Sequence, residues 1–124
     1  MSHKILIADD EPNILLSLEF LMKREGFQVS VAADGNAALA AVEREQPDLL
    51  LLDVMMPGKT GFEVCQALRA DERHAELLIL LLTAKGRETD VAKGLALGAN
   101  AYMTKPFSTR ELVDKVRALL GAGK

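Results

Sequence analysis

The sequence predicts an α/β fold built on a mostly parallel sheet, and three observations support this prediction. Short apolar runs alternate with stretches of amphipathic helical periodicity, and this alternation repeats five times along the chain. Residues 49–52 and 77–82 are unbroken apolar runs, which are typical of strands covered on both faces. The 124 residues are 49% hydrophobic and 27% charged, which is ordinary for one globular domain.

The first β–α unit begins with the apolar run at residues 4–8, which predicts a strand. Pro12 favours a helix start just after it, because a proline in the first helical turn loses no hydrogen bond. Gly26 is expected to end this helix, and residues 28–32 predict the second strand. The apolar face of the helix comprises Ile14, Leu15, Leu18, Leu21 and Met22.

The middle of the chain continues the same alternation. A second helix is expected at residues 36–45, after an Asp-Gly turn and before Pro47, and residues 48–52 predict the third strand. Thr60 and Glu63 have the spacing of a capping box, in which each side chain bonds the backbone N–H of the other residue. A third helix should therefore begin at this point.

The last two units complete the pattern. Residues 77–82 predict the fourth strand, and a helix at residues 88–97 should follow it and end at Gly98. Residues 100–104 predict a short fifth strand, and a second capping-box pattern at residues 108–111 opens the last helix. Five consecutive β–α units imply parallel strands joined by helical crossovers.

Polar side chains follow four of the predicted strands, at the point where each strand ends. Asp9 and Asp10 follow the first strand, Asp53 the third, Thr83 the fourth and Lys105 the fifth. The carboxyl ends of parallel strands share one edge of the sheet, where open α/β sheets bind their ligands. We therefore expect these five side chains to form one site.

This set of side chains suits phosphoryl transfer. Three neighbouring carboxylates repel, at about 4 kcal/mol per pair for ~4 Å and an effective dielectric near 20, so a divalent cation is expected among them. Magnesium suits an oxygen-only site that leaves positions for water and phosphate. A metal, a carboxylate nucleophile, a lysine and a hydroxyl are the parts that phosphoryl transfer needs, and an aspartate nucleophile forms an acyl phosphate.

Each of these residues taken singly also has a simpler interpretation. Asp9 and Asp10 could cap the helix that Pro12 begins, and Thr83 could merely end a strand. Lys105 could be a solvated charge. It is the joint spacing of the set that supports a site.

The motifs resemble those of response-regulator receiver domains, the chemotaxis-regulator-like phosphoacceptor domains of two-component systems. The matching segments occur in the family's order and spacing, at residues 5–11, 47–58, 82–84 and 98–107. The resemblance covers about residues 4–120 and implies a single receiver domain over residues 1–124. It also implies a flavodoxin-like (βα)5 doubly wound sandwich, with a parallel five-stranded sheet of order 2-1-3-4-5.

The resemblance implies a role for each acidic residue. Asp53 matches the phosphoacceptor, Asp10 the direct Mg²⁺ ligand, and Asp9 a supporting ligand that acts largely through water. The backbone carbonyl of Met55 would be a further ligand. The positions of Met55 and Lys85 tune dephosphorylation in this family. The domain would thus phosphorylate and dephosphorylate itself as a switch, rather than turn over a substrate as an enzyme.

The same resemblance implies how the switch works. Thr83 and Lys105 would contact phosphoryl oxygens, and the small Ala84 would leave room for the phosphodonor. The phosphoryl group adds about −1.5 to −2 charges, so Thr83 would move toward it while Tyr102 turns inward. The face formed by the fourth helix, fifth strand and fifth helix would then change. The Lys105–Pro106 bond is expected to be cis.

The resemblance also implies the partners. A sensor histidine kinase or a phosphotransfer protein would donate the phosphoryl group, and a downstream target protein or output domain would read the result. DNA-binding relatives that pair through the fourth helix, fifth strand and fifth helix often carry Asp-Asp before the tyrosine, where this chain has Asn100 and Ala101. We therefore expect no constitutive dimer of that kind, and a phosphorylation-dependent dimer stays open.

The charge balance argues against nucleic-acid and membrane partners. With 15 basic and 18 acidic residues the formal net charge is −3, and no basic patch or polybasic run stands out. The lone cysteine, Cys65, cannot form an internal disulfide, which favours a cytoplasmic location, and we expect a small buried side chain there. His3 and His74 are isolated, and both are expected at the surface.

Three other functions compete with the switch as interpretations of this sequence. A magnesium-dependent phosphatase of the haloacid-dehalogenase style also uses Asp, Thr and Lys, but its nucleophile follows the first strand, whereas Asp53 follows the third. A flavodoxin-like nucleotide binder needs a phosphate loop after the first strand, where residues 9–11 would repel a phosphate. A phosphorylation-independent interaction module would not need the complete set.

Overall fold

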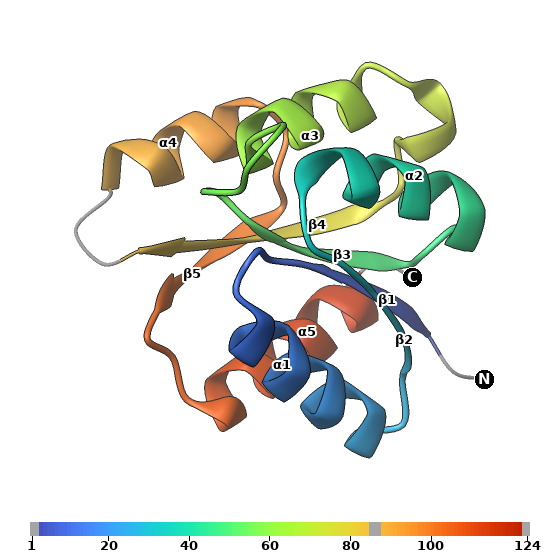
Figure 1. Ribbon diagram of the computed structural model, residues 1–124, viewed down its shortest axis with the longest axis vertical. Coiled ribbons are helices and arrows are strands. Elements are labelled where there is room, and N and C mark those ends of the chain that lie inside the picture. Colours follow the sequence, from blue (N-terminus) through green and yellow to red (C-terminus); the bar gives the residue numbers. More distant parts are fainter. Residues whose placement is uncertain (1–2, 85–87, 123–124) are drawn as a thin grey trace.

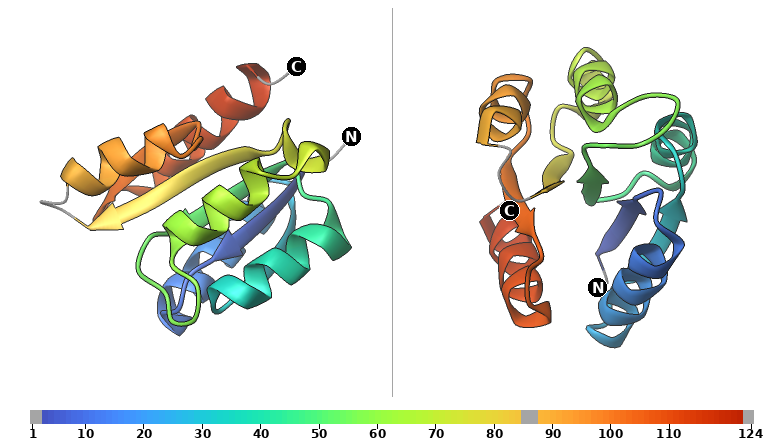
Figure 2. Two further views of the ribbon diagram at one scale, coloured as in Figure 1. Left: turned by 90° about the horizontal axis from the view of Figure 1, so that it is seen from above. Right: turned by 60° about the vertical axis from the view of Figure 1, so that its left-hand side comes forward.

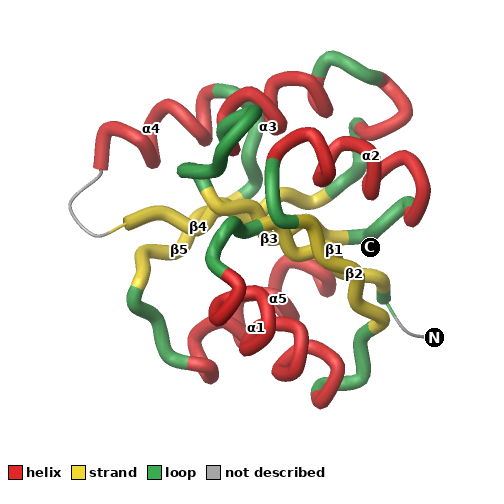
Figure 3. Tube along the Cα trace, in the orientation of Figure 1, coloured by secondary structure: helices red, strands yellow, loops and turns green. Residues whose placement is uncertain are grey.

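The computed structural model describes residues 3–84 and 88–122 of the chain. A parallel five-stranded sheet lies between two layers of helices (Figures 1 and 3). The strand order is β2-β1-β3-β4-β5, which confirms the order that the family resemblance implied. The carboxyl ends of all five strands therefore point to the same edge of the sheet.

The central strand is the most buried part of the sheet, because β1 and β4 flank it and helices cover both faces. Its run of four leucines ends at Asp53, and all five residues of β3 are buried. The observed bounds are β1 (Lys4–Ala8), β2 (Gln28–Ala32), β3 (Leu49–Asp53), β4 (Leu78–Ala84) and β5 (Ala101–Lys105).

Helices cover the two faces unequally, with α1 and α5 on one face and α2, α3 and α4 on the other (Figure 2). The bounds are α1 (Pro12–Arg24), α2 (Gly35–Glu45), α3 (Gly61–Arg69), the 3-10 helix η1 (Glu72–His74), α4 (Glu88–Ala96) and α5 (Thr109–Ala122). Side chains alternate along each strand, so the sheet separates two hydrophobic clusters. One cluster packs under α2 and α3, and the other under α1 and α5.

Helix ends follow the predicted signals closely. Thr60 and Glu63 form the expected capping box, with hydrogen bonds of 2.9 and 3.2 Å to each other's backbone. Ser108 and Glu111 form the second one, with both bonds at 3.0 Å. Gly26 follows the end of α1 with a φ of 93°, a left-handed conformation that costs glycine little.

Most boundaries lie within one or two residues of the prediction, and β4 differs most. This strand continues through Thr83 and Ala84, because β5 pairs with them: Thr83 lies opposite Thr104, and Ala84 opposite Lys105. Two predicted site residues, Thr83 and Lys105, are therefore held within the sheet rather than in the loops that follow it.

The expectation that His74 lies at the surface is wrong. The 3-10 helix η1, which the sequence pattern did not predict, turns the imidazole of His74 inward, and only 5% of the residue is exposed.

Cys65 is buried as expected, and its thiol donates to the Leu97 carbonyl oxygen at 3.6 Å. Among the helices of the described residues, none has both the length and the apolar character needed to cross a bilayer.

Candidate functional site

The sheet edge brings the three predicted carboxylates together. Asp9 and Asp10 follow β1, and Asp53 ends β3, the neighbouring strand. One carboxylate oxygen from each of them lies within 4.8 Å of the other two. Asp9 and Asp53 are buried, whereas Asp10 is exposed, so Asp10 is the member of the group most open to solvent.

Lys105 links two of these carboxylates from the end of β5. Its Nζ donates to Asp9 Oδ2 at 2.9 Å and to Asp53 Oδ1 at 3.3 Å. Burial of Lys105 opposes its charge, but the hydrogen bonds and the attraction of the two carboxylates outweigh burial, so the pKa of Lys105 is raised. Lys105 therefore stays charged within the site.

The carboxyl group of Asp53 has a perturbed pKa. Burial is the main cause that raises its pKa to about 6, and the charges of Asp9 and Asp10 add to this, while Lys105 acts in the opposite direction. One ammonium does not fully compensate the local negative charge. A further cation beside Asp53 would favour its ionised form.

A cavity of about 310 Å³ opens at this edge. Asp10 and Asp53 line it, and Asp9 instead accepts a hydrogen bond of 2.9 Å from the backbone N–H of Glu11. The lining residues are Asp10, Glu11, Asp53, Val54, Met55, Thr83, Ala84 and Lys105. The cavity thus combines three acidic residues, Asp10, Glu11 and Asp53, with the ammonium of Lys105 and the hydroxyl of Thr83.

Thr83 contributes a hydroxyl without a partner. Its Oγ1 is buried and has no hydrogen bond within residues 3–84 and 88–122. A buried polar atom without a hydrogen bond costs free energy, so such an atom points to a group that arrives later. Thr83 lines the cavity beside Lys105, so an anion bound there could accept a hydrogen bond from this hydroxyl.

The donor set fits a magnesium ion. The three carboxylates offer one hard oxygen each, which is the kind of ligand that Mg²⁺ prefers. Met55, whose backbone carbonyl is the further predicted ligand, lines the cavity. Among the described residues that line this cavity there is no cysteine and no histidine. Burial strengthens the repulsion among the three carboxylates, and the positive charge of the ion would offset this repulsion.

The structure also shows where the remaining predicted residues lie. Ala84 is exposed and lines the cavity, so its small side chain leaves an approach to Asp53. Tyr102, on β5, is 42% exposed and turns its ring toward solvent. The Lys105–Pro106 bond is cis, as the resemblance implied. Lys85 lies outside the described residues.

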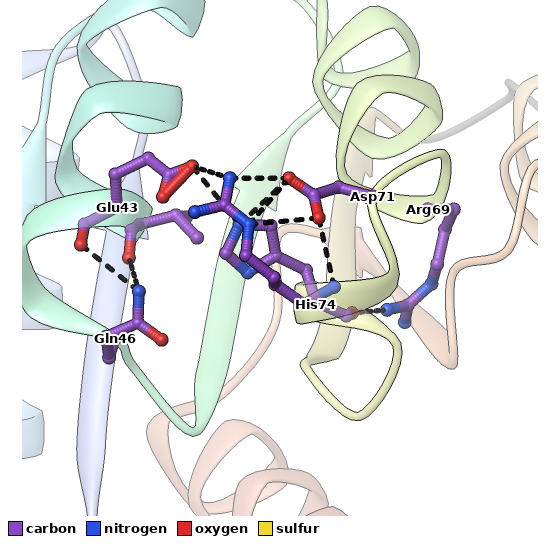
Figure 4. Close-up of polar contacts among 7 residues, drawn as sticks. Glu43, Gln46, Arg69, Asp71 and His74 are labelled. Atoms are coloured by element: carbon purple, nitrogen blue, oxygen red, sulfur yellow. Dashed lines mark hydrogen bonds and ion pairs between the residues drawn. The ribbon is translucent and has the colours of Figure 1, made fainter.

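A second polar group, which the sequence did not predict, lies at the opposite edge of the sheet. Glu43 of α2 faces Asp71 and His74, which come from the segment after α3 (Figure 4). The guanidinium of Arg73 lies between the carboxylates, with Nη2 at 2.5 Å from Glu43 Oε1 and 2.7 Å from Asp71 Oδ2. The hydrogen bonds from Arg73 lower the pKa of Asp71 to about 2. This group therefore already contains its own cation.

Comparison with known proteins agrees with this geometry. The model of the response regulator receiver domain family matches residues 5–117. A protein assigned as a response regulator from Chloroflexus aurantiacus is 36% identical, with a TM-score of 0.93 and coverage of 98% of this chain and 99% of that chain. The chemotaxis protein CheY4 of Vibrio cholerae is 31% identical, with a TM-score of 0.90 and coverage of 96% and 99%.

A third similar structure belongs to a larger protein. NtrX of Brucella abortus is 26% identical with a TM-score of 0.92, and the match covers 99% of this chain but only 28% of NtrX. Receiver domains thus occur both alone and within multidomain regulators. The family match over most of the sequence, the shared fold and the acidic edge lead to one conclusion: the chain belongs to the response-regulator receiver domain family of two-component signalling systems.

Proposed function

We propose that this domain is a magnesium-dependent switch that accepts a phosphoryl group on Asp53. The observation that carries the proposal is the arrangement around one cavity: clustered carboxylates, a fixed lysine ammonium and the unpartnered hydroxyl of Thr83. The donor would be the phosphohistidine of a sensor histidine kinase or of a phosphotransfer protein.

The proposed transfer is a displacement at phosphorus. An oxygen of Asp53 forms the new bond as the phosphorus–nitrogen bond of the donor breaks, and the imidazole leaves with the electron pair and takes up a proton. Asp10, Asp53 and the Met55 carbonyl would hold Mg²⁺, with Asp9 supporting it. When bound, the ion neutralises charge that develops on the phosphoryl oxygens. Water later attacks the phosphorus, the bond between phosphorus and the Asp53 oxygen breaks, and inorganic phosphate leaves as the carboxylate is restored.

Lys105 and Thr83 supply the protein's own contacts to the phosphoryl group. Lys105 would exchange its contact with Asp53 for one with a phosphoryl oxygen, because it lies only 3.3 Å from Asp53 Oδ1. The Thr83 hydroxyl would donate its first hydrogen bond to the new anion. Since β4 and β5 carry these residues, the transfer pulls on this pair of strands.

The same movement would transmit the signal. As Thr83 moves toward the phosphoryl group, the exposed ring of Tyr102 turns inward to fill the vacated space. The face formed by α4, β5 and α5 would then change its packing and bind a target protein or output domain. Residues 1–124 would act as a single receiver domain in the cytoplasm.

A constitutive dimer through this face is not part of the proposal. The side-chain oxygen of Asn100 accepts hydrogen bonds from Arg69 Nη2 and from the Ile79 backbone N–H, both at 2.8 Å. This residue is therefore engaged within its own chain. A dimer would form only after phosphorylation.

The test is the intact mass of the protein after incubation with acetyl phosphate, with and without Mg²⁺. We expect one added phosphoryl group that requires both Mg²⁺ and Asp53, so the Asp53→Asn variant stays unmodified. Equal labelling of Asp53→Asn would contradict the proposed nucleophile. Binding of beryllofluoride with Mg²⁺ is the control, because it distinguishes rapid hydrolysis from an interaction module that never accepts phosphate.

A further inference from the structure

The first residue of α3 lies unusually close to the backbone of the proposed phosphoacceptor. A Cβ atom added to Gly61 would lie 2.4 Å from the Asp53 carbonyl oxygen and 2.8 Å from the Val54 Cα. Real Cβ atoms do not approach other atoms at such distances. Both neighbours are backbone atoms, so no side-chain rotation can relieve the overlap.

Both sides of this contact are fixed. The Val54 N–H donates to the Leu82 carbonyl at 3.2 Å, which ties the end of β3 to β4. The Gly61 N–H donates to the Val54 carbonyl at 2.8 Å, and the capping box of Thr60 and Glu63 holds the first turn of α3. The peptide between Asp53 and Val54 is therefore held between a strand and a helix start.

Other glycines differ in what a side chain would meet. At Gly94 the nearest atom is Leu81 Cδ1, the end of a flexible side chain, and at Gly26 and Gly121 nothing lies within 4 Å. At Gly35 a Cβ would meet backbone, but the backbone of Lys59 in the loop that precedes α3. Among the glycines of the described residues, Gly61 is the one that contacts the backbone of Asp53.

We propose that Gly61 is a positioning residue for the phosphoryl-transfer site. Because Gly61 has no side chain, the start of α3 packs directly against the Asp53–Val54 peptide. The position of this peptide in turn sets the direction of the Asp53 carboxylate and the position of the Met55 carbonyl. The Asp53 carboxylate lies within hydrogen-bonding distance of Lys105, and that geometry depends on the same peptide. This inference rests on the proposed function.

The direct test is Gly61→Ala, compared with Val64→Ala as the matched control. Val64 is fully buried in the same helix, so its truncation weakens α3 packing without adding an atom against Asp53. We expect Gly61→Ala to slow phosphorylation by acetyl phosphate at least about tenfold and to weaken Mg²⁺ binding, since small misplacements are costly in transfer reactions. At a similar urea midpoint, Val64→Ala should change both much less.

Equal phosphorylation rates in Gly61→Ala and Val64→Ala would overturn the positioning role. Backbone amide NMR shifts of residues 53–55 provide a readout that does not need turnover, and Gly61→Ala should move them more than Val64→Ala does. If the wild-type chain accepts no phosphoryl group, the proposed function fails, while these shifts still test the contact.

A second variant covers the case in which Gly61→Ala does not fold. Glu63→Ala removes an exposed side chain and one half of the capping box, so it loosens the first turn of α3 beside Gly61. We expect it to shift the amide resonances of Asp53 and Val54 and to lower Mg²⁺ affinity several-fold. Unchanged resonances and affinity would contradict the inference.

Discussion

At the acidic edge of the sheet, which Asp9, Asp10 and Asp53 form, burial and like charges oppose the ionised form of Asp53 while one ammonium favours it. Asp53 is almost completely buried, near two other carboxylates and one ammonium. Lys105 divides its hydrogen bonds between Asp9 and Asp53. The resting site therefore keeps an uncompensated carboxylate and an unpartnered hydroxyl, both of which a metal ion and a phosphoryl group would satisfy.

The perturbed pKa of Asp53 predicts that the difference in stability between the wild type and Asp53→Asn depends on pH. Its pKa of about 6 in the folded chain exceeds its ordinary value of 3.8, so the folded state binds more protons between these pH values. Its contribution to stability is favourable below pH 4 and is lost as the pH rises through 6. In metal-free buffer, Asp53→Asn should therefore be about 1 to 3 kcal/mol more stable than wild type at pH 7.

Urea unfolding of both proteins from pH 4 to pH 8 checks this prediction. The difference in unfolding free energy between Asp53→Asn and wild type should be small near pH 4 and should level off above pH 6. A difference that stays constant over this range would show that the Asp53 carboxyl is not perturbed.

The unpartnered hydroxyl of Thr83 predicts that its removal abolishes the signalling response without lowering the stability of the resting protein. Thr83→Val replaces a buried hydroxyl by a methyl group of similar shape, so the resting protein should keep its stability or gain up to about 1 kcal/mol. The response of Tyr102 to beryllofluoride should be lost. Tyr102 is the single tyrosine of a chain without tryptophan, so intrinsic fluorescence reports on this ring alone. A wild-type response in Thr83→Val would contradict the role of the hydroxyl.

At the scale of elements, one arginine ties the α4–β5 connection to the rest of the fold. Arg69, the last residue of α3, donates to the carbonyls of Gly98, His74 and Leu77 and to Asn100 Oδ1 at 2.7–2.9 Å. All four acceptors are neutral. The start of β5 is thereby anchored, whereas its far end carries Lys105 and contacts the acidic residues of the site.

The hydrogen bonds of Arg69 predict that replacing this arginine by alanine costs much more stability than replacing Arg73, four residues further along the chain. Arg69→Ala leaves several partly buried acceptors unpaired and should cost at least about 2 kcal/mol in urea unfolding. Arg73→Ala removes an exposed guanidinium whose ion pairs are open to water, so its urea midpoint should change little. Similar losses for the two variants would mean that the Arg69 contacts are not structural.

The elements show what the sequence could predict. Capping boxes, most strand ends and the position of Asp53 follow from local patterns, because each depends on neighbours in the chain. The end of β4 does not, because pairing with β5 extends this strand to Ala84. The 3-10 helix η1 has no apolar period, so burial of His74 could not be foreseen from polar residues at 72–74. Lys105 contacts Asp9 as well as Asp53, and this second contact depends on distances in the folded chain that the spacing of residues in the sequence does not reveal.

The whole molecule should gain stability from magnesium. Ligands that bind only the folded state stabilise it by mass action, by about 2.7 kcal/mol at 100 times the dissociation constant. The acidic edge assembles residues from two strands, so it exists only in the folded chain. Urea melts with and without Mg²⁺ should therefore differ in wild type and much less in Asp10→Asn. Equal magnesium stabilisation of the two proteins would place the ion elsewhere.

The sheet also divides the molecule into two interiors. Leu50 and Leu52 of β3 belong to the cluster under α2 and α3, and Leu49 and Leu51 to the cluster under α1 and α5. Losses caused by truncations on opposite sides should then add, as expected for sites without shared partners. Substitutions can accumulate in one interior without a compensating change in the other. The side that carries α1 and α5 could thus diversify while the packing of α3 against Asp53 stays as it is.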